Sequence, residues 1–324
     1  MSAGVSEVTS KLAWIAVDWG SSNLRAWAMD DQGKVLASAS SQRGMLSLAP
    51  AEYEAELQQV IDDWLPSTGQ IPVLICGMAG ARQGWQEAAY LTTPTRLDQL
   101  SRGAVLPPVS DARLKVYLLP GLSQTSSTAT HFDVMRGEET QLAGLLADAP
   151  GFSGLVCLPG THAKWARLTD GTVTEFSTYL TGELYQLLAQ QSVLKHSVGQ
   201  DDLQHDACRQ AFTDAVTTTY QAPEHFSQRL FGVRAQDLLD NTLPSGSARS
   251  AVLAAHLSGM TIGLELADAC RDLSRGEAVT LIGNELLSAR YALALHTLGI
   301  DSHRVDGDTA VLAGLTLAYQ HTTL

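Results

Sequence analysis

Residues 14–26 read Trp14-Ile-Ala-Val-Asp18-Trp-Gly20-Ser21-Ser22-Asn23-Leu-Arg25-Ala. The apolar run at residues 14–17 predicts a strand that is buried on both faces. After this run, Asp18 can hold a hard cation directly or through bound water, and Gly20 allows a sharp turn. The turn also offers hydrogen-bonding side chains, namely Ser21, Ser22 and Asn23. The stretch therefore indicates a site for phosphate and metal, although an ordinary β-turn favours the same residue types.

A second stretch of the chain has the same arrangement. It reads Leu155-Val-Cys-Leu158-Pro-Gly160-Thr161-His162-Ala-Lys164-Trp-Ala-Arg-Leu168-Thr-Asp170-Gly171-Thr-Val173. In both stretches a predicted strand leads into a glycine-hydroxyl turn, a second strand, a hairpin turn and a third strand. Gly20 corresponds to Gly160, and Gly33 to Gly171 when the second hairpin is shortened. We therefore predict two related domains whose turns clamp a polyphosphate in the cleft between them, with an acidic residue in the first turn only.

The composition is typical of a globular enzyme. The 324 residues are enough for two domains, and the hydrophobic and charged shares are 45% and 17%. The net charge of −13 argues against nucleic acid and anionic membranes as partners, because both bind basic surfaces. An anionic ligand must therefore be bound by locally placed Arg and Lys side chains and by backbone N–H groups.

Two further features predict a cytoplasmic protein. Residues 1–11 lack the pattern of a signal peptide, and polar residues interrupt the apolar segment at residues 251–270, so that we expect no membrane span.

The cysteines Cys76, Cys157, Cys208 and Cys270 lie far apart, without the paired spacing of metal or redox sites. We expect them to be buried, reduced thiols.

Between the motifs, the pattern predicts alternating helices and strands. Helices are expected at residues 51–65, 138–146 and 285–298 and from residue 308 onward, and further strands at residues 73–76, 116–119 and 279–282. Residues 181–254 read as a helical insertion without a counterpart in the first half. We therefore predict an α/β fold with a first domain at residues 1–150 and a second at residues 151–324.

The phosphate turns resemble motifs of the actin-like ATPase superfamily of sugar kinases, which includes hexokinase and glycerol kinase. Residues 18–26 match the first phosphate motif of the glycerol kinase branch, including Arg25 seven residues after Asp18. Residues 159–162 resemble the second phosphate motif, and Leu281-Ile-Gly283-Asn284-Glu-Leu-Leu287 is similar to the adenosine motif, without its commoner double glycine. The resemblance implies duplicated ribonuclease H-like domains of the actin and hexokinase type, with a nucleotide-binding cleft between them.

Four segments are more narrowly similar to 2-dehydro-3-deoxygalactonokinases. They are Gly77-Met-Ala-Gly80-Ala-Arg82, Met135-Arg136-Gly137-Glu138-Glu139-Thr140-Gln141, Leu158-Pro-Gly-Thr-His-Ala-Lys164 and Thr178-Tyr-Leu-Thr-Gly-Glu183. This resemblance covers nearly the whole chain. It implies an ATP- and Mg²⁺-dependent kinase that phosphorylates the terminal (6-) hydroxyl of 2-dehydro-3-deoxy-D-galactonate in galactonate breakdown.

The resemblance also implies roles for particular residues. Asp18 would hold Mg²⁺ through its water shell, and Arg25 or Lys164 would add positive charge to the transferring group. The expected nucleotide contacts are Gly20, Ser21, Ser22, Asn23, Gly160, Thr161, His162, Lys164, Gly283 and Asn284. For His162, the alternative to a phosphate contact is a structural role as a hydrogen-bonded histidine.

Glu138 is the expected catalytic base, because the glycerol kinase branch has an Asp at the start of a helix in the corresponding place. Glu139 is the alternative base or a substrate contact, and both acids are also favoured at a helix N-terminus by the helix dipole alone. Arg82 and Arg136 are the candidates for binding the substrate carboxylate, since a guanidinium can grip it with two hydrogen bonds. Gly80, in a glycine-rich loop, would permit close approach of the sugar acid.

Two other classes of function remain open. One is an enzyme of the same fold that acts on another sugar or sugar acid, or a phosphatase. The other is a non-catalytic ATP-binding module, which would need neither Glu138 nor the arginines, so their presence favours a kinase. Residues 179–194 would cover the sugar site or form a subunit contact, and homo-oligomerisation is left open.

Overall fold

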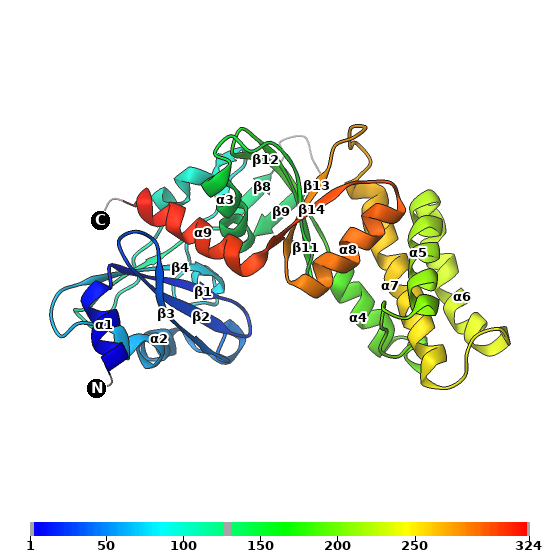
Figure 1. Cartoon of the computed structure of the whole chain (residues 1–324), viewed down its shortest axis with the longest axis horizontal. Coiled ribbons are helices and arrows are strands. Elements are labelled where there is room, and N and C mark those ends of the chain that lie inside the picture. The colour runs from blue at the N-terminus through cyan, green and yellow to red at the C-terminus, as the bar shows by residue number, and fades with distance from the viewer. Residues whose placement is uncertain (1–2, 126–130, 323–324) are drawn as a thin grey trace. The chain divides into compact units, whose positions relative to one another are not determined.

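The computed structural model describes residues 3–125 and 131–322 (Figure 1). The chain forms two compact units. Unit 1 contains Met1–Ser153, Arg167–Phe176 and Gly307–Leu324, and unit 2 contains Gly154–Ala166 and Ser177–Asp306. The first segment of unit 1 ends three residues after the expected boundary at residue 150, and the C-terminal helix groups with unit 1 rather than with unit 2.

The sheet of unit 1 has the strand order β3-β2-β1-β4-β7. Its strands are β1 (Trp14–Trp19), β2 (Leu24–Met29), β3 (Val35–Ser41), β4 (Ile71–Gly77) and β7 (Leu114–Leu118). The central strand β1 is buried at every position except Asp18, as its apolar run predicts. It runs antiparallel to β2 and parallel to β4, so that Asp18 lies opposite both Arg25 and Cys76. The first phosphate motif therefore lies where the parallel strands β1 and β4 end.

Helices cover both faces of this sheet. Side chains alternate between the faces of a strand, and those of β1 accordingly enter two different cores. One core contains Ile15 and Val17 with side chains of α2 (Tyr53–Ile61), and the other contains Trp14 and Ala16 with side chains of α9 (Gly307–Gln320). The predicted helix at residues 51–65 is shorter than expected, because a 3₁₀ turn follows it at Asp62–Trp64.

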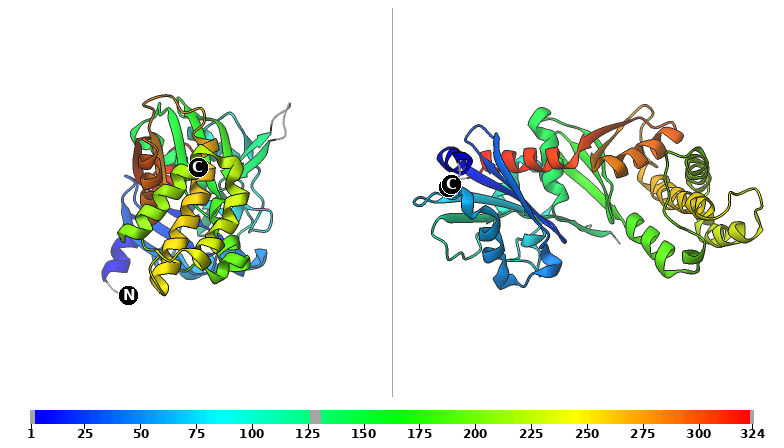
Figure 2. Two further views of the ribbon diagram at one scale, coloured as in Figure 1. Left: turned by 90° about the vertical axis from the view of Figure 1, so that its right-hand side faces the viewer. Right: turned by 60° about the horizontal axis from the view of Figure 1, so that its bottom comes forward.

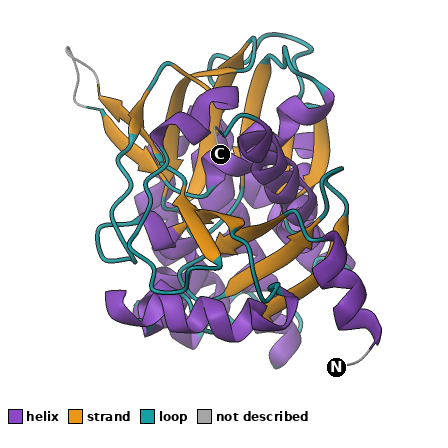
Figure 3. Ribbon diagram, turned by 90° about the vertical axis from the view of Figure 1, so that its left-hand side faces the viewer, coloured by secondary structure: helices purple, strands orange, loops and turns teal. Residues whose placement is uncertain are grey.

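The remaining elements of unit 1 lie around this layered core. They are α1 (Ala3–Lys11), α3 (Glu138–Asp148), and a small sheet of β5 (Leu91–Thr92), β8 (Leu122–Thr125) and β9 (Phe132–Met135). The antiparallel pair β8 and β9 is visible at the upper left of Figure 3. The strand β9 leads directly to α3, which carries the two candidate glutamates.

The helices α3 and α9 contact each other through their backbones at two glycines (Figure 1). A Cβ atom on Gly144 would lie 2.0 Å from the carbonyl oxygen of Ala310. A Cβ atom on Gly314 would lie 1.8 Å from the carbonyl oxygen of Thr140. Since neither position has room for a side chain, the two glycines fix how closely α3 and α9 approach each other.

We expect Gly314→Ala to destabilise the protein by at least about 2 kcal/mol, because the added methyl group forces two packed helix backbones apart. Gly232→Ala in α6 (Phe226–Leu239) is the matched control, since nothing lies within 4 Å of a Cβ atom at that position. Alanine should there stabilise the helix by roughly 0.5–1 kcal/mol. Denaturant unfolding of both variants tests the prediction, and equal stabilities would contradict it.

The strands of unit 2 follow one another in the order β12-β11-β10-β13-β14. They are β10 (Gly154–Leu158), β11 (Ala163–Thr169), β12 (Thr172–Tyr179), β13 (Val279–Gly283) and β14 (Ser302–Asp306). Parallel pairing joins β10 to β13 and β13 to β14. The end of β11 and the first residues of β12 belong to unit 1, where Thr172 and Val173 pair with β6 (Thr95–Arg96).

Five helices belong to unit 2, and the predicted helical insertion accounts for most of them. They are α4 (Thr181–Gln191), α5 (Asp206–Gln221), α6, α7 (Ser247–Ala269) and α8 (Glu285–Thr297). The helices α5 and α7 run side by side (Figure 2). Among the described residues, α7 is the helix that is long and apolar enough to cross a membrane, but 72% of its apolar stretch is buried inside the protein. It is therefore a core helix of unit 2.

The four cysteines are buried free thiols, as predicted. Burial raises the pKa of the Cys76 and Cys157 thiols well above the usual value. Both are therefore neutral core side chains.

Candidate active site

The first phosphate turn follows β1 and is closed by backbone hydrogen bonds. The N–H of Gly20 donates to the carbonyl of Asn23 over 2.9 Å. The N–H groups of residues 45–46 donate to the carbonyls of Gly20 and Ser21, which ties the turn to a second loop. Ser21, Ser22 and Asn23 are exposed. The turn is therefore fixed by its backbone, while its side chains are open to a ligand.

Asp18 forms an ion pair with Arg25 beside this turn. The Nη2 atom of Arg25 donates to Oδ2 of Asp18 over 2.6 Å, and its Nη1 atom donates to Asp308 at the start of α9. The guanidinium also lies 5.6 Å from the centre of the Trp27 ring. Burial lowers the pKa of Arg25, but the two carboxylates raise it, and the net direction is upward. Arg25 is therefore a fixed positive charge held by two acids.

These carboxylates fit a magnesium ion. Mg²⁺ prefers oxygen ligands, keeps several waters, and usually binds one or two carboxylates together with substrate phosphates. Asp18 and Asp308 provide two carboxylates that bind different nitrogens of Arg25. Within residues 3–125 and 131–322, no group of three or more His, Cys, Asp or Glu is arranged to hold a metal. The site therefore suits an ion that is completed by water and phosphate.

The helix α3 begins next to the end of β4. Its first residue follows Gly137, which has a φ of 107°, a conformation that favours glycine. A Cβ atom on Gly137 would lie 3.5 Å from the Cα atom of Gly77, the last residue of β4. Glu138 is half-buried, and its Oε2 atom accepts the backbone N–H of Arg136 over 3.1 Å. The fold thus places Glu138 beside the strand ends that carry the first motif.

Glu139 is buried, with an exposed fraction of 1%. Its two carboxyl oxygens accept the backbone N–H of Gly137 at 3.0 and 2.7 Å, and Oε1 also accepts the hydroxyl of Thr140. Burial raises the pKa of Glu139 to about 8, and the charge of Glu138 adds to this shift against the hydrogen bonds from Gly137. Near neutral pH this side chain therefore tends to carry a proton.

Glu139→Gln is expected to remove a pH-dependent loss of stability. The folded protein holds the proton of Glu139 up to about pH 8, whereas the unfolded chain releases it near its ordinary pKa of about 4.3. The stabilising contribution of the acid is therefore complete below about pH 4 and is lost as the pH rises to about 8. The melting temperature of the wild type should fall relative to that of the variant over this range. Exposed Glu175→Gln is the control, and parallel curves for all three proteins would contradict the prediction.

The two candidate arginines differ in accessibility. The Nη2 atom of Arg136 donates to the carbonyl of Ala88 over 2.7 Å, and the guanidinium lies 4.4 Å from the centre of the Tyr90 ring. Its Nε and Nη1 atoms are inaccessible and have no hydrogen-bond partner among the described residues. A Cβ atom on Gly80 would lie 2.9 Å from Nη1. Arg136 thus holds the loop from inside, whereas the side chain of Arg82 is 79% exposed and donates to Glu87 over 3.4 Å.

In unit 2, the second phosphate turn lies against the start of α4. The N–H of Glu183 donates to the carbonyl of Thr161 over 3.0 Å, and a ring nitrogen of His162 lies 2.5 Å from the Glu183 carboxylate. A Cβ atom on Gly182 would lie 2.6 Å from the carbonyl oxygen of Gly160. Thr161 and His162 are exposed, but Lys164 is 7% exposed and its Nζ donates to the Thr178 hydroxyl over 2.7 Å.

The proposed adenosine motif forms the start of α8. Asn284 caps this helix, because its side-chain oxygen accepts the backbone N–H of Leu287 over 2.9 Å. A Cβ atom on Gly283 would lie 3.8 Å from Pro159, next to the second phosphate turn. The helix cap and the phosphate turn are therefore neighbours within unit 2.

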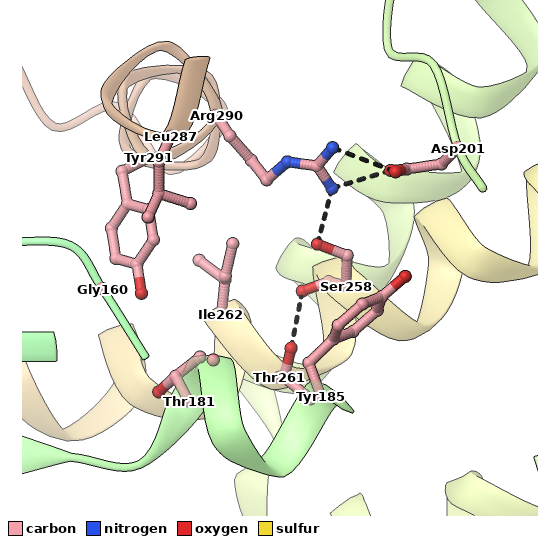
Figure 4. Close-up of a pocket in the computed structure, with 11 residues that line it drawn as sticks. Gly160, Thr181, Tyr185, Asp201, Ser258, Thr261, Ile262, Leu287, Arg290 and Tyr291 are labelled. Carbon is pink, nitrogen blue, oxygen red and sulfur yellow. Dashed lines mark hydrogen bonds and ion pairs between the residues drawn. The ribbon is translucent and has the colours of Figure 1, made fainter. Parts of the chain in front are cut away.

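A cavity of about 190 Å³ opens beside these two motifs (Figure 4). Its lining residues are Gly160, Thr181, Gly182, Tyr185, Asp201, Ser258, Thr261, Ile262, Leu287, Arg290 and Tyr291. Arg290 binds both oxygens of Asp201, at 2.7 and 3.1 Å, and donates to the hydroxyl of Ser258. The positive charge in the cavity wall is thus already paired.

A buried acid lies behind the cavity wall. Glu265 accepts the indole N–H of Trp165 over 2.6 Å and the hydroxyl of Tyr291 over 2.8 Å. Burial raises its pKa to about 7, against the hydrogen bonds from Thr181, Trp165 and Tyr291.

Comparison with known proteins identifies the family. The model of the 2-keto-3-deoxy-galactonokinase family matches residues 18–318. The chain belongs to this family. It is 42% identical over 308 residues to a Rhizobium meliloti (strain 1021) protein named probable 2-dehydro-3-deoxygalactonokinase DgoK1, covering 94% of this chain and 96% of that one. It is 36% identical over 302 residues to 2-dehydro-3-deoxygalactonokinase of Escherichia coli (strain K12), covering 93% and 96%.

A solved structure is also similar to this family member. It is a crystal structure from Sinorhizobium meliloti assigned to the 2-dehydro-3-deoxygalactonokinases, with 40% sequence identity and a TM-score of 0.86. The alignment covers 95% of this chain and 98% of the other. The α/β architecture described above therefore belongs to the 2-keto-3-deoxy-galactonokinase family.

The structure brings some of the predicted site residues of this kinase family member together and adds others. Asp18 and Arg25 are in contact, and so are the turn at residues 160–162 and the start of α4. Sequence reasoning does not identify Asp308 as a partner of Arg25, although the pattern places Asp308 at a helix start. It also misses four residues that line the cavity, namely Asp201, Arg290, Tyr291 and Thr181, and Glu265 behind its wall. Of these, Thr181 lies inside a segment that the resemblance had already singled out.

Proposed function

We propose that this protein transfers the γ-phosphoryl group of ATP to the terminal (6-) hydroxyl of 2-dehydro-3-deoxy-D-galactonate in galactonate breakdown. Membership of the 2-keto-3-deoxy-galactonokinase family carries this proposal. The local geometry supports it, because phosphoryl transfer requires a carboxylate for the metal, donors for the phosphates and a base for the attacking hydroxyl. The expected location is the cytoplasm.

The proposed fold is a duplication of ribonuclease H-like domains. The strand order β3-β2-β1-β4-β7 in unit 1 and the order β12-β11-β10-β13-β14 in unit 2 correspond strand for strand. In each order the central strand, β1 or β10, is followed in the chain by a phosphate turn. It pairs in parallel with a strand that comes later in the chain, β4 or β13. This correspondence supports the repeat that the sequence indicates.

We assign nucleotide-binding residues within each unit. The exposed turns at residues 20–23 and 160–162 would donate hydrogen bonds to phosphate oxygens. The cavity beside Gly160 would take the nucleoside, because Arg290 is already neutralised by Asp201 and the walls favour an uncharged, planar group over an anion. Gly283 and Asn284 would contribute by placing α8 against this group.

We propose that Glu138, rather than Glu139, is the base. Glu139 is buried and tends to be protonated near neutral pH, whereas Glu138 is partly exposed. Glu138 would take the proton of the substrate hydroxyl while that oxygen bonds to the γ-phosphorus. The bond from this phosphorus to the β–γ bridging oxygen breaks, and ADP leaves. Glu139 would then support the start of α3.

Arg25 would provide positive charge near the transferring group, since Lys164 is buried against Thr178. Asp18, with Asp308 nearby, would hold Mg²⁺. When bound, this ion would neutralise negative charge on the phosphates.

Arg82 is the proposed partner of the substrate carboxylate, and Arg82→Ala should raise the KM for the sugar acid roughly 10- to 100-fold, the value of a charged hydrogen bond. The KM for ATP should not change. Arg102→Ala is the control, because Arg102 is another exposed arginine of unit 1. Steady-state kinetics measure both constants. An unchanged sugar-acid KM in Arg82→Ala would exclude this role, and the same result in Arg136→Ala would exclude both candidate arginines.

The function is tested by ADP formation from MgATP with different acceptors. The acceptors are 2-dehydro-3-deoxygalactonate, 2-dehydro-3-deoxygluconate, galactonate, glycerol and none. Turnover that strongly favours the galactonate-derived acid is expected. Preference for another acceptor would assign a different sugar or sugar acid, and phosphate release without acceptor would indicate a hydrolase. ATP binding without turnover on any acceptor would favour a non-catalytic module.

A further inference from the structure

The buried carboxylate of Glu265 has no role in the proposed reaction. It lies within α7, among apolar side chains, and is 2% exposed. An acid is rarely buried so completely unless hydrogen bonds compensate for the loss of water. The identity of its partners therefore indicates what the carboxylate does.

Three donors from three elements converge on Glu265. Trp165 on β11 donates to one oxygen over 2.6 Å, and Tyr291 on α8 donates to the other over 2.8 Å. Thr181 at the start of α4 is the third neighbour, and its side chain acts to lower the pKa of Glu265. Thr181 and Tyr291 both line the cavity, and their side chains are drawn in Figure 4. Glu265 thus connects two walls of the cavity to the core of unit 2.

A metal site does not account for this acid. Cys157 and Cys270 lie close enough to Glu265 to affect one another electrostatically, but burial keeps both thiols protonated. In the part of the chain that the structure describes, no group of three or more potential ligands is arranged around a metal position. The polar contacts of Glu265 that remain are those with Trp165 and with two residues of the cavity wall, Thr181 and Tyr291.

We propose that Glu265 is a positioning residue for the nucleotide, which fixes the hydroxyls of Thr181 and Tyr291 in the wall of the cavity. It does not itself touch the ligand. The inference rests on the proposed kinase function, because that function assigns the nucleoside to this cavity. Side chains that are held in place before binding lose less freedom when the ligand arrives, and this strengthens binding.

Glu265→Gln tests this role without changing the shape of the side chain. An amide keeps one oxygen as an acceptor, but its NH₂ group cannot accept a hydrogen bond, so that the bond donated to the second carboxylate oxygen is lost. Glu56→Gln is the matched control. Glu56 in α2 is also buried, at 3% exposure, and accepts hydrogen bonds from Ser41 and Arg43 within unit 1.

We expect Glu265→Gln to raise the Kd for ADP, measured by calorimetry, and the KM for ATP by about 10-fold. The KM for the sugar acid and kcat at saturating ATP should not change. Glu56→Gln should leave the Kd for ADP unchanged even where it lowers the melting temperature. An unchanged Kd in Glu265→Gln, or an equal rise in the KM for the sugar acid, would overturn the proposal.

Tyr291→Phe provides a second test, which does not depend on the folding of one variant. If Glu265 acts through Tyr291, the double variant Glu265→Gln/Tyr291→Phe should bind ADP no more weakly than the single variant with the higher Kd. Additive effects of the two substitutions on the free energy of ADP binding would contradict this coupling. Wild-type protein that binds ADP but phosphorylates no acceptor would overturn the proposed function alone. Wild-type protein that binds no ADP would overturn both.

Discussion

Glu138→Gln is expected to lower kcat by roughly 10²- to 10⁴-fold, the usual contribution of a positioned general base. Glutamine has the shape of glutamate, and its side-chain oxygen can still accept the backbone N–H of Arg136. The start of α3 should therefore remain intact while the group that takes the proton is lost. Steady-state kinetics should show a reduced kcat with little change in the KM for ATP.

The pH profile separates this role from a structural one. In the wild type, kcat should fall at low pH as the base becomes protonated, and this limb should be absent from Glu138→Gln. Exposed Glu175→Gln serves as the control and should keep the wild-type profile. Near-normal turnover of Glu138→Gln would move the base to Glu139 or to another residue.

Much of the fold could be predicted because the sequence signals are local. The strand β1 is an apolar run that ends in an acid and a glycine, and α3 follows Gly137 with two acids in its first turn. Other elements lack such signals. In β14, two positions are partly buried and three are exposed, so the strand has no apolar run, and β5 and β6 have two residues each. Their formation depends on pairing with neighbours that are distant in sequence.

The candidate site also combines features that local sequence signals predict with features that they do not. The turns at residues 20–23 and 160–162 are continuous motifs, and the sequence identifies them. The contact between Arg25 and Asp308 joins residues 283 positions apart. It exists because α9 belongs to unit 1 and packs on α3 through Gly144 and Gly314. No local pattern predicts it. Likewise, Glu265 interrupts an apolar segment in the sequence, and only the folded structure shows that donors surround it.

Asp18→Asn is expected to lower kcat by about 10³-fold, because it removes the carboxylate that would hold Mg²⁺ near the phosphates. Asparagine is nearly the same shape, but it is a weaker ligand for a hard cation and a weaker partner for Arg25. The Mg²⁺ concentration that gives half-maximal activity should rise in this variant. Asp31→Asn, in the exposed hairpin that follows β2, is the control and should behave as the wild type.

Asp18→Asn affects both the binding of Mg²⁺ and the ion pair with Arg25. Asp308→Asn separates these two effects. Both acids bind Arg25, but Asp18 is held at the end of a buried strand with its side chain 20% exposed, whereas the side chain of Asp308 is 66% exposed at a helix start. If Asp18 is the main metal ligand, its replacement should shift the Mg²⁺ dependence more than that of Asp308, and Asp308→Asn should give the smaller loss of activity. If the two variants lose equal activity with an unchanged Mg²⁺ dependence, Asp18 acts by holding Arg25, and the metal must bind elsewhere.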